Sequence, residues 1–367
     1  MDSYLELKNL SVGYGKYVVL SNVNISIKKG EVIAMIGPNG VGKSTLLKTI
    51  SGELEGLEGE ILFDGKNLKD YSYSELSRKM AVILTDRIKT ELTSCRDIVA
   101  TGRYPYTGRL GILRSEDEKI VSEALELVHA QDIAYRDFNN ISDGQRQRIL
   151  LARAICQKPE LILLDEPTSY LDIKHKLELL SILTEMAREK NITVITSLHE
   201  IDLAEKVADR IITVKGREEF AIGKIQEVFQ EENIRSLYEI DNGFFDPLFG
   251  SIEMKKPKGD RAEIFVIAGG GRGIPIFREL QKKGIPFAAG IIHENDIDYR
   301  TAKMLAAELI VEKAFSPISR ENLEKAKSMI NRCKKTVNTV QEFGAGNEGI
   351  RELIEYAQKE GKLWQRL

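Results

Sequence analysis

The chain has 367 residues, of which 42% are hydrophobic and 30% charged, and its formal net charge is -3 at pH 7. This length exceeds the usual size of one hydrophobic core, so two domains are expected, and the composition excludes a disordered chain. The small net charge argues against nucleic acid as a partner. No apolar run is long enough to span a bilayer, and Cys95, Cys156 and Cys333 lack the spacing of a zinc site or a disulfide framework.

Residues 4–65 alternate in the manner of short strands, interrupted by one helix that begins at Gly42. A GxxxxGK[ST] motif lies between the apolar run EVIAMI and the helix-like run STLLKTI. Glycines there let backbone N–H groups face phosphate oxygens, while Lys43 can neutralise the phosphates and Ser44 can bind Mg²⁺. We therefore expect a phosphate-binding loop at Gly37, Pro38, Asn39, Gly40, Val41, Gly42, Lys43, Ser44 and Thr45. The alternative is a tight strand-to-helix turn without a ligand.

Residues 74–138 are more helical than the flanking parts of the chain. The run EKIVSEALELVHA has an apolar helical face formed by Ile120, Val121, Ala124, Leu125 and Val128. This pattern predicts a helical subdomain over about residues 86–140.

The segment ISDGQRQR at residues 141–148 leads into an amphipathic helix. On its own, this segment is equally well explained by Ser142 and Asp143 as an ordinary helix N-cap. The apolar strand LILL follows and ends in the adjacent carboxylates Asp165 and Glu166. In a parallel sheet these side chains would face the phosphate loop, where Asp165 can hold Mg²⁺ and Glu166 can act as a general base on water.

A long helix then runs to Lys190, and the apolar strand ITVITSL ends at His199. Taken alone, a histidine in this place is more often a polar surface residue.

Together these motifs resemble, in order, those of the ATP-binding cassette (ABC) transporter family over about residues 1–237. The resemblance implies an α/β P-loop NTPase fold with a RecA-like core, an antiparallel β subdomain and a helical subdomain over residues 1–240. It also implies that the chain hydrolyses ATP with Mg²⁺ and forms a homodimer. In this family, residues like Glu166, His199 and Lys43 are catalytic. The family signature usually reads Leu-Ser-Gly-Gly-Gln, whereas Asp143 here replaces a glycine.

The resemblance also assigns residues around the nucleotide. Tyr14 is similar to the aromatic residue that stacks on adenine, with Tyr17 as a rival nearby. In the dimer, the nucleotide on one subunit would meet the other subunit's Ser142, Asp143, Gly144, Gln145 and Asp172. The family glutamine that approaches the metal is replaced by Thr85, followed by Asp86. We expect Ser44, Asp165 and Thr85 as metal ligands.

Residues 97–105, DIVATGRYP, resemble a segment of importers for iron-siderophore, haem and cobalamin complexes. This branch implies two further partners, an integral membrane permease and an extracytoplasmic substrate-binding protein. It also implies a cytoplasmic location, peripheral on the inner face of the cell membrane. The alternative is a plain helix end with Gly102 and Pro105 as stop signals.

The tail is not covered by this resemblance. Residues 241–261 break the periodicity and are expected to be a linker, and residues 262–367 predict a small Rossmann-like parallel α/β domain of about four βα units. Its cluster AGGGRGIP at residues 268–275 can hold a phosphate or carboxylate of a small-molecule effector, or form a tight turn only. Asp296 is expected as a helix N-cap. Two functional alternatives stay open: a metabolite-sensing ATPase switch and a non-transport ABC ATPase.

Overall fold

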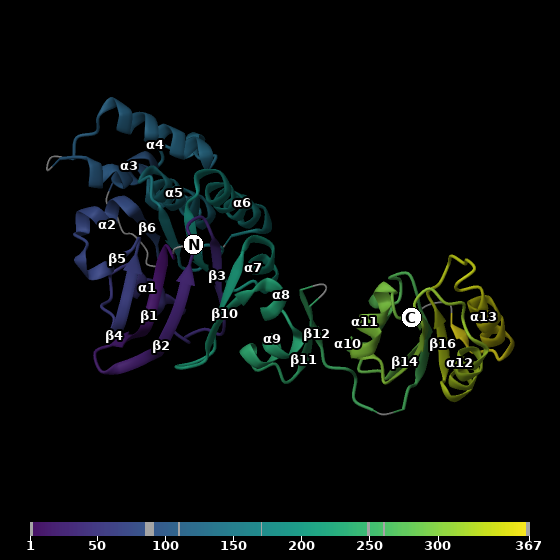
Figure 1. The fold of residues 1–367 in the computed structure, drawn as a ribbon. Helices are drawn as coiled ribbons and strands as arrows, with labels where there is room; N and C mark the ends of the chain where they lie inside the picture. Colours follow the sequence, from purple (N-terminus) through teal and green to yellow (C-terminus); the bar gives the residue numbers. More distant parts are fainter. Residues whose placement is uncertain are drawn as a thin grey trace. The chain divides into compact units, whose positions relative to one another are not determined.

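The computed structural model describes residues 3–84, 92–108, 111–169, 171–247, 250–259 and 261–364. The chain forms two compact units, Met1–Tyr238 and Glu239–Leu367, which are described separately (Figure 1). Within the described residues, no helix is both long and apolar enough to cross a membrane.

One sheet of the first unit is antiparallel, with strand order β2-β1-β4-β5. Its strands are β1 (Leu5–Tyr14), β2 (Tyr17–Ile27), β4 (Glu58–Phe63) and β5 (Lys66–Asn67). β1 and β2 form a long hairpin that turns at Gly15, whose φ of 58° suits glycine. Alternate residues of β1, such as Leu5 and Leu7, are buried in the core of the unit.

The second sheet carries the predicted motifs and has the order β10-β9-β3-β8-β7-β6. β3, β6, β7, β8 and β9 are parallel, and β10 is antiparallel to β9. β3, β7 and β8 are entirely buried, as expected for parallel strands covered on both faces. The strands are β3 (Val32–Ile36), β6 (Met80–Ile83), β7 (Leu161–Leu164), β8 (Thr193–Ser197), β9 (Arg210–Val214) and β10 (Phe220–Lys224).

The helices of the first unit follow the predicted order. They are α1 (Lys43–Ile50), α2 (Tyr73–Lys79), α3 (Cys95–Ala100), α4 (Ser115–Leu127), α5 (Asp143–Cys156), α6 (Ile173–Lys190), α7 (Ile201–Val207), α8 (Ile225–Val228) and α9 (Glu231–Tyr238). α3 and α4 both pack on α5 and form a helical layer (Figure 1). The apolar face predicted for residues 120–128 is buried, which confirms the helical pattern.

The second unit is built on a parallel sheet of order β15-β14-β13-β16-β17 with helices on both faces. α10 and α11 contribute to one core and α12 and α13 to the other. The strands are β13 (Ile264–Ile267), β14 (Phe287–His293), β15 (Glu308–Glu312), β16 (Lys335–Asn338) and β17 (Leu363–Trp364). The helices are α10 (Ile274–Lys282), α11 (Ile297–Leu305), α12 (Arg320–Arg332) and α13 (Gly349–Lys359).

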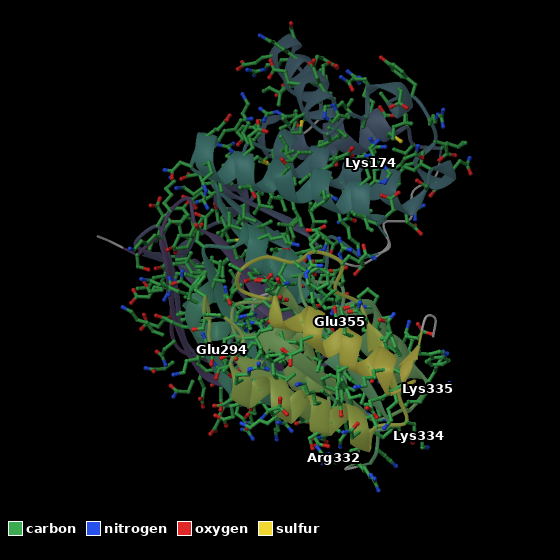
Figure 2. All side chains as sticks on the ribbon, turned by 90° about the vertical axis from the view of Figure 1, so that its right-hand side faces the viewer. Lys174, Glu294, Arg332, Lys334, Lys335 and Glu355 are labelled. Atoms are coloured by element: carbon green, nitrogen blue, oxygen red, sulfur yellow. The ribbon has the colours of Figure 1, made fainter. Side chains whose placement is uncertain are left out.

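Charged side chains mark the two ends of this sheet. Glu294 follows the carboxyl end of β14, whereas Lys334 and Lys335 lie where β16 begins, and Figure 2 shows them at opposite ends of the unit. Lys334 is paired with Glu263, and Lys335 lies over the Trp364 ring. The basic end is therefore engaged in internal contacts.

The stretch expected to be a linker contains a hairpin of β11 (Gly243–Asp246) and β12 (Ser251–Met254). Its buried carboxylates are paired with arginines of the second unit: Glu253 accepts from Arg278 at 3.1 Å, and Asp246 lies 3.5 Å from Arg300. The hairpin thus belongs to the second unit, which corrects the linker expectation. The polar residues of this stretch suggested a loop because the arginines that pair with them lie in later elements of the chain.

Candidate functional site

The predicted phosphate loop joins the buried strand β3 to α1. Gly37, Gly40 and Gly42 have φ values of 148°, 79° and 112°, which favour glycine. A Cβ atom on Gly37 would lie 2.0 Å from the Val214 carbonyl oxygen, so that position also requires glycine for space. The sequence therefore folds here into a tight turn that leads directly into the N-terminus of α1.

Lys43 is enclosed by this loop. Its Nζ donates hydrogen bonds of 2.7 Å to the carbonyl oxygens of Gly37 and Pro38. Burial lowers the pKa of Lys43, although the nearby carboxylates of Glu166 and Asp165 act in the opposite direction. The ammonium group thus lies within electrostatic reach of both predicted carboxylates.

Asp165 and Glu166 follow β7, and β8 lies between β7 and β3 in the sheet. This order brings Ser197, the last residue of β8, against both residues: its hydroxyl donates to Asp165 Oδ1 at 2.7 Å and accepts from the Glu166 amide at 2.8 Å. Asp165 is buried. Ser197 is not among the residues predicted from the sequence, because its two contacts depend on the order of the strands.

Glu166 is held in a distinct backbone conformation with a φ of 49°. Its Oε1 lies 2.7 Å from His199 Nε2, and the Ser169 hydroxyl donates to Oε2 at 3.4 Å. Both Glu166 and His199 are partly exposed to solvent. The structure therefore brings the predicted base and the predicted histidine into direct contact at a place that water can reach.

Three of the remaining metal and adenine candidates lie within the described residues: Ser44, Tyr14 and Tyr17. Ser44 is half-buried in the first turn of α1, and Thr45 is buried beside it. Thr85 and Asp86 lie outside the described residues. Tyr14 and Tyr17 are opposite each other in the β1–β2 hairpin and are both exposed, so either ring is available to a planar ligand.

Ser142 is the N-cap of α5, and it forms a capping box with Gln145. Asp143 is paired with Arg146 at 3.0 Å, which offsets its negative charge. Asp172 caps α6 through the His175 amide. In the part of the chain that the structure describes, no hydrogen bond or ion pair joins these residues to the phosphate loop. One chain therefore does not bring the two groups of predicted residues together.

The segment around Gly102 and Arg103 has a structural role. α3 ends at Ala100, close to the helix end given as the alternative, and the chain continues as a 3₁₀ turn, η2 (Thr101–Tyr106), that contains both Gly102 and Pro105. Arg103 is buried and bonds to Asp117 at 2.8 Å and to the Cys156 carbonyl oxygen at 2.9 Å. A Cβ on Gly102 would lie 2.3 Å from the Arg153 carbonyl oxygen. These residues fix η2 on α5.

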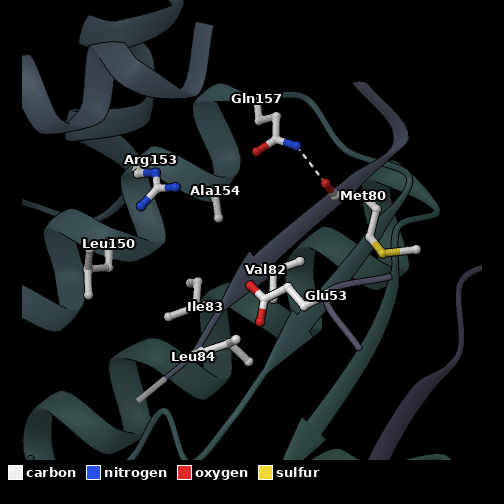
Figure 3. Close-up of a pocket in the computed structure, with 9 residues that line it drawn as sticks. All are labelled: Glu53, Met80, Val82, Ile83, Leu84, Leu150, Arg153, Ala154 and Gln157. Carbon is white, nitrogen blue, oxygen red and sulfur yellow. Dashed lines mark hydrogen bonds between the residues drawn. The ribbon is translucent and has the colours of Figure 1, made fainter. Parts of the chain in front are cut away.

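A groove of about 320 Å³ lies between α5 and the end of β6 (Figure 3). Gln157 closes one end by donating to the Met80 carbonyl oxygen at 2.6 Å. Glu53 and Arg153 line the groove, and burial lowers the pKa of Arg153. Within the described ranges, no ion pair to Arg153 is found. The groove therefore offers both an apolar wall and a charged contact.

Tyr238 is the last residue of α9 and of the first unit. Its hydroxyl is buried beside the Gly37 amide; burial raises the pKa of Tyr238, and the amide opposes this rise. Among the described residues, this hydroxyl makes no hydrogen bond of normal geometry. The end of the first unit thus lies against the phosphate loop.

Comparison with known families gives two separate matches. A family described as ABC transporter matches residues 20–169, and one described as the MJ0874 family matches residues 287–364. The two matches fall in different units.

Three relatives show how far the similarity extends. An uncharacterized ABC transporter ATP-binding protein of Methanocaldococcus jannaschii is 41% identical over 78% of this chain and 99% of that protein. The petrobactin import ATP-binding protein of Bacillus anthracis is 35% identical over 68% of this chain and 92% of that protein. The cobalamin import ATP-binding protein of Halobacterium salinarum is 30% identical over 95% of this chain and 89% of that protein, so this alignment extends well into the second unit.

Among solved structures, the dimeric post-hydrolysis state of an ATP-binding cassette bound to ADP and Pi is similar to the first unit. It has a TM-score of 0.53 and 30% identity, and covers 60% of this chain and 98% of that chain.

Proposed function

Since the chain belongs to the ATP-binding proteins of ABC transporters and is an ATP hydrolase of the importer type, we propose that it energises uptake of a metal chelate through a separate permease. One observation carries the proposal: Lys43, the Asp165-Glu166 pair and His199 all follow the carboxyl ends of the neighbouring strands β3, β7 and β8. Iron-siderophore, haem and cobalamin complexes form the proposed substrate class, supported by the petrobactin and cobalamin relatives.

The phosphates of ATP bind in the loop of residues 37–45. Lys43 then exchanges its hydrogen bonds to the loop carbonyls for bonds to the β- and γ-phosphates. The negative charge of the phosphates stabilises the buried ammonium group. Tyr14 stacks on the adenine, with Tyr17 opposite it as the second candidate.

The oxygen donors beside the loop fit Mg²⁺, which prefers oxygen ligands. Asp165 is buried with Oδ1 bonded to Ser197, and Ser44 offers a hydroxyl from α1. These two residues would hold the ion, with Thr85 as a third proposed ligand. When bound, Mg²⁺ neutralises charge on the phosphates.

Glu166 is the proposed general base. Its carboxylate takes a proton from a water molecule whose oxygen attacks the γ-phosphorus, and the bond to the β-phosphate oxygen breaks to release ADP and phosphate. His199 contacts Oε1 of Glu166 and orients it, while Lys43 stabilises charge on the transferred group.

Two copies of the chain complete each other's sites. Among the described residues, no hydrogen bond or ion pair joins the phosphate loop to Ser142, Gly144, Gln145 or Asp172 of the same chain. The N-terminus of α5 is suited to a partner's nucleotide. The Asp143–Arg146 pair lessens repulsion between Asp143 and phosphate. The dimeric cassette with ADP and Pi supports this arrangement.

The groove beside Arg153 is the proposed docking site of the permease, because it lies between α5 and β6 and is lined by an arginine that has no ion pair among the described residues (Figure 3). An extracytoplasmic binding protein would deliver the substrate to that permease. This role places the chain on the cytoplasmic face of the membrane.

The substitution Glu166→Gln tests the assignment of the base. We expect Mg²⁺-ATP binding to persist and a dimer to accumulate, while the hydrolysis rate falls about 100-fold or more because the amide cannot accept the proton. Phosphate release and size-exclusion chromatography with ATP measure the two effects. Glu189→Gln, on the exposed end of α6, is the matched control and should hydrolyse ATP normally. Undiminished hydrolysis by Glu166→Gln would contradict the proposal.

Uptake tests the substrate class. Cells lacking this gene should lose accumulation of radiolabelled cobalamin or of a ferric siderophore and keep amino-acid uptake. Cobalamin is the first to test, because the cobalamin import relative aligns with both units. Normal uptake of every metal chelate would overturn the proposed class.

A further inference from the structure

The second unit contains a cavity of about 310 Å³ that the ATPase site does not use. It lies over the carboxyl ends of β13, β14 and β16 and is lined by Gly269, Gly270, Arg272, His293, Asp296 and Asn347, among others. From β13 the chain builds β14 and β15 on one side and then returns to place β16 on the other side. Open α/β sheets bind ligands in the crevice where the strand order reverses in this way.

The loop after β13 exposes backbone to the cavity. Gly270 and Gly271 have φ values of 70° and 80°, and a Cβ on Gly270 would meet nothing within 4 Å. Gly273 is different, because a Cβ there would lie 2.6 Å from both Ala268 and Phe277. The loop is therefore closely packed at Gly273 and has free space beside Gly270, where a ligand can approach the main chain.

The amides of this loop are already bonded to carboxylates. Gly270 donates to Asp296 at 2.8 Å, and Gly273 and Ile274 donate to the fully buried Asp298 at 2.9 and 3.1 Å. A phosphate at this helix N-terminus would have to displace Asp298. Carboxylates of the chain itself therefore occupy the three amides that were expected to hold a phosphate or carboxylate of an effector.

The cation at the cavity is also engaged. Arg272 bonds to Gln341 and, at 3.0 Å, to Glu342. On the opposite side, His293 Nε2 lies 2.8 Å from the Ser316 carbonyl oxygen, which requires a proton on Nε2 and leaves Nδ1 as an acceptor when the ring is neutral. His293 Nδ1 in this tautomer and the Asp296 carboxylate are therefore hydrogen-bond acceptors among the residues that line the cavity.

Each carboxylate oxygen of Asp296 can accept a further hydrogen bond. Its Oδ2 accepts from the Gly270 amide and its Oδ1 from the Asp298 amide at 2.9 Å, so each oxygen retains a further lone pair. Two adjacent hydroxyl groups can donate to the two oxygens of one carboxylate. The apolar side chains of Ile291, Val340 and Ile350 line the same cavity and can cover a flat ring.

We propose that this cavity binds an uncharged ligand with adjacent hydroxyl groups, of the ribonucleoside class, with Asp296 accepting from the ribose hydroxyls. A phosphorylated ligand binds less well, because the amides of residues 270, 273 and 274 already donate to Asp296 and Asp298. This site is separate from the ATPase site, and its occupation does not depend on the proposed transport substrate.

Calorimetric titration of the full chain tests this site, with the ATPase site first filled by Mg²⁺-ADP. The probes are adenosine, guanosine, cytidine and uridine, their 2′-deoxy forms, and the corresponding 5′-monophosphates. At least one ribonucleoside should bind, its 2′-deoxy form about tenfold more weakly because one bond to a charged acceptor is lost, and its monophosphate no better. No binding by any ribonucleoside, equal binding of the deoxy form, or tighter binding of the monophosphate would each overturn the proposal.

Asp296→Asn is the diagnostic variant, because asparagine can still cap α11 but loses the charge. It should weaken ribonucleoside binding about tenfold and leave ATP hydrolysis unchanged. Glu294→Gln removes an exposed charge from the same turn and should bind normally. If Asp296→Asn unfolds, Gly269→Ala serves instead, since its methyl group would lie 3.4 Å from Asp296 Oδ2 and obstruct it. Normal binding by a folded Asp296 or Gly269 variant would refute the assignment.

Discussion

Glu312 is a buried carboxylate that stabilises the second unit. It accepts hydrogen bonds from the Ser319 amide at 2.8 Å, the Ser319 hydroxyl at 2.9 Å and the Asn322 side chain at 2.9 Å. Burial alone would raise its pKa, but these bonds outweigh burial and lower the pKa from 4.5 to about 2. The charged form is therefore part of the folded state, at the start of α12.

The sign of this shift predicts a pH dependence. Because the folded pKa lies below the unfolded value, Glu312 contributes about 3 kcal/mol above pH 4.5, and this is lost as the pH falls from 4.5 through about 2. Glu312→Gln should lower the unfolding free energy at pH 7 and flatten its pH dependence across that window. Urea titration followed by Trp364 fluorescence measures this, since Trp364 is the chain's single tryptophan and lies in the second unit.

Glu355→Gln is the control for this measurement. Glu355 is an exposed residue of α13, labelled in Figure 2. Its substitution should leave the profile unchanged. An unaltered pH profile in Glu312→Gln would show that Glu312 does not carry the effect.

At the residue scale, local spacing was enough to identify some of the site. Asp165 follows the apolar strand β7 directly, and Lys43 begins α1 after the glycine loop that follows β3, so the sequence predicts both positions. The Ser197 bridge was not predictable, because it depends on β8 lying between β3 and β7. Strand order is a property of the whole sheet and has no local signal.

At the scale of elements, the packing of η2 on α5 depends on one glycine. Gly102→Ala would place a methyl group 2.3 Å from the Arg153 carbonyl oxygen, so the two elements must separate. We expect a loss of about 1 to 3 kcal/mol of stability, measured by denaturant unfolding of the first unit. Gly108→Ala is the control, since a Cβ there meets nothing within 4 Å. Equal stability of the two variants would show that η2 can move at no cost.

The sequence predicted the parallel strands of the first unit better than the antiparallel β11–β12 hairpin. The apolar runs of β3, β7 and β8 are clear because both faces of these strands are buried. The β11–β12 hairpin was missed because its buried Glu253 and Asp246 are compensated by Arg278 and Arg300, which lie in other elements. Buried charges of this kind cannot be distinguished from loop residues by pattern alone.

At the scale of the whole molecule, the ATPase residues that the structure describes all belong to the first unit. A chain ending after Ile240 should therefore keep Mg²⁺-ATP hydrolysis within about twofold of the full chain in the absence of effectors. The petrobactin import relative supports independent folding, since 252 residues of alignment, little more than the first unit, cover 92% of that protein. Phosphate release by the purified fragment measures this, with Glu166→Gln in the same fragment as the inactive control. A folded but inactive fragment would show that the second unit completes the site.

Tyr238 connects the end of the first unit to its phosphate loop. Its buried hydroxyl lies beside the Gly37 amide, and the next residue, Glu239, begins the second unit. The last turn of α9 therefore supports the loop from within the same unit, so a residue outside every predicted nucleotide-binding motif helps to shape that loop.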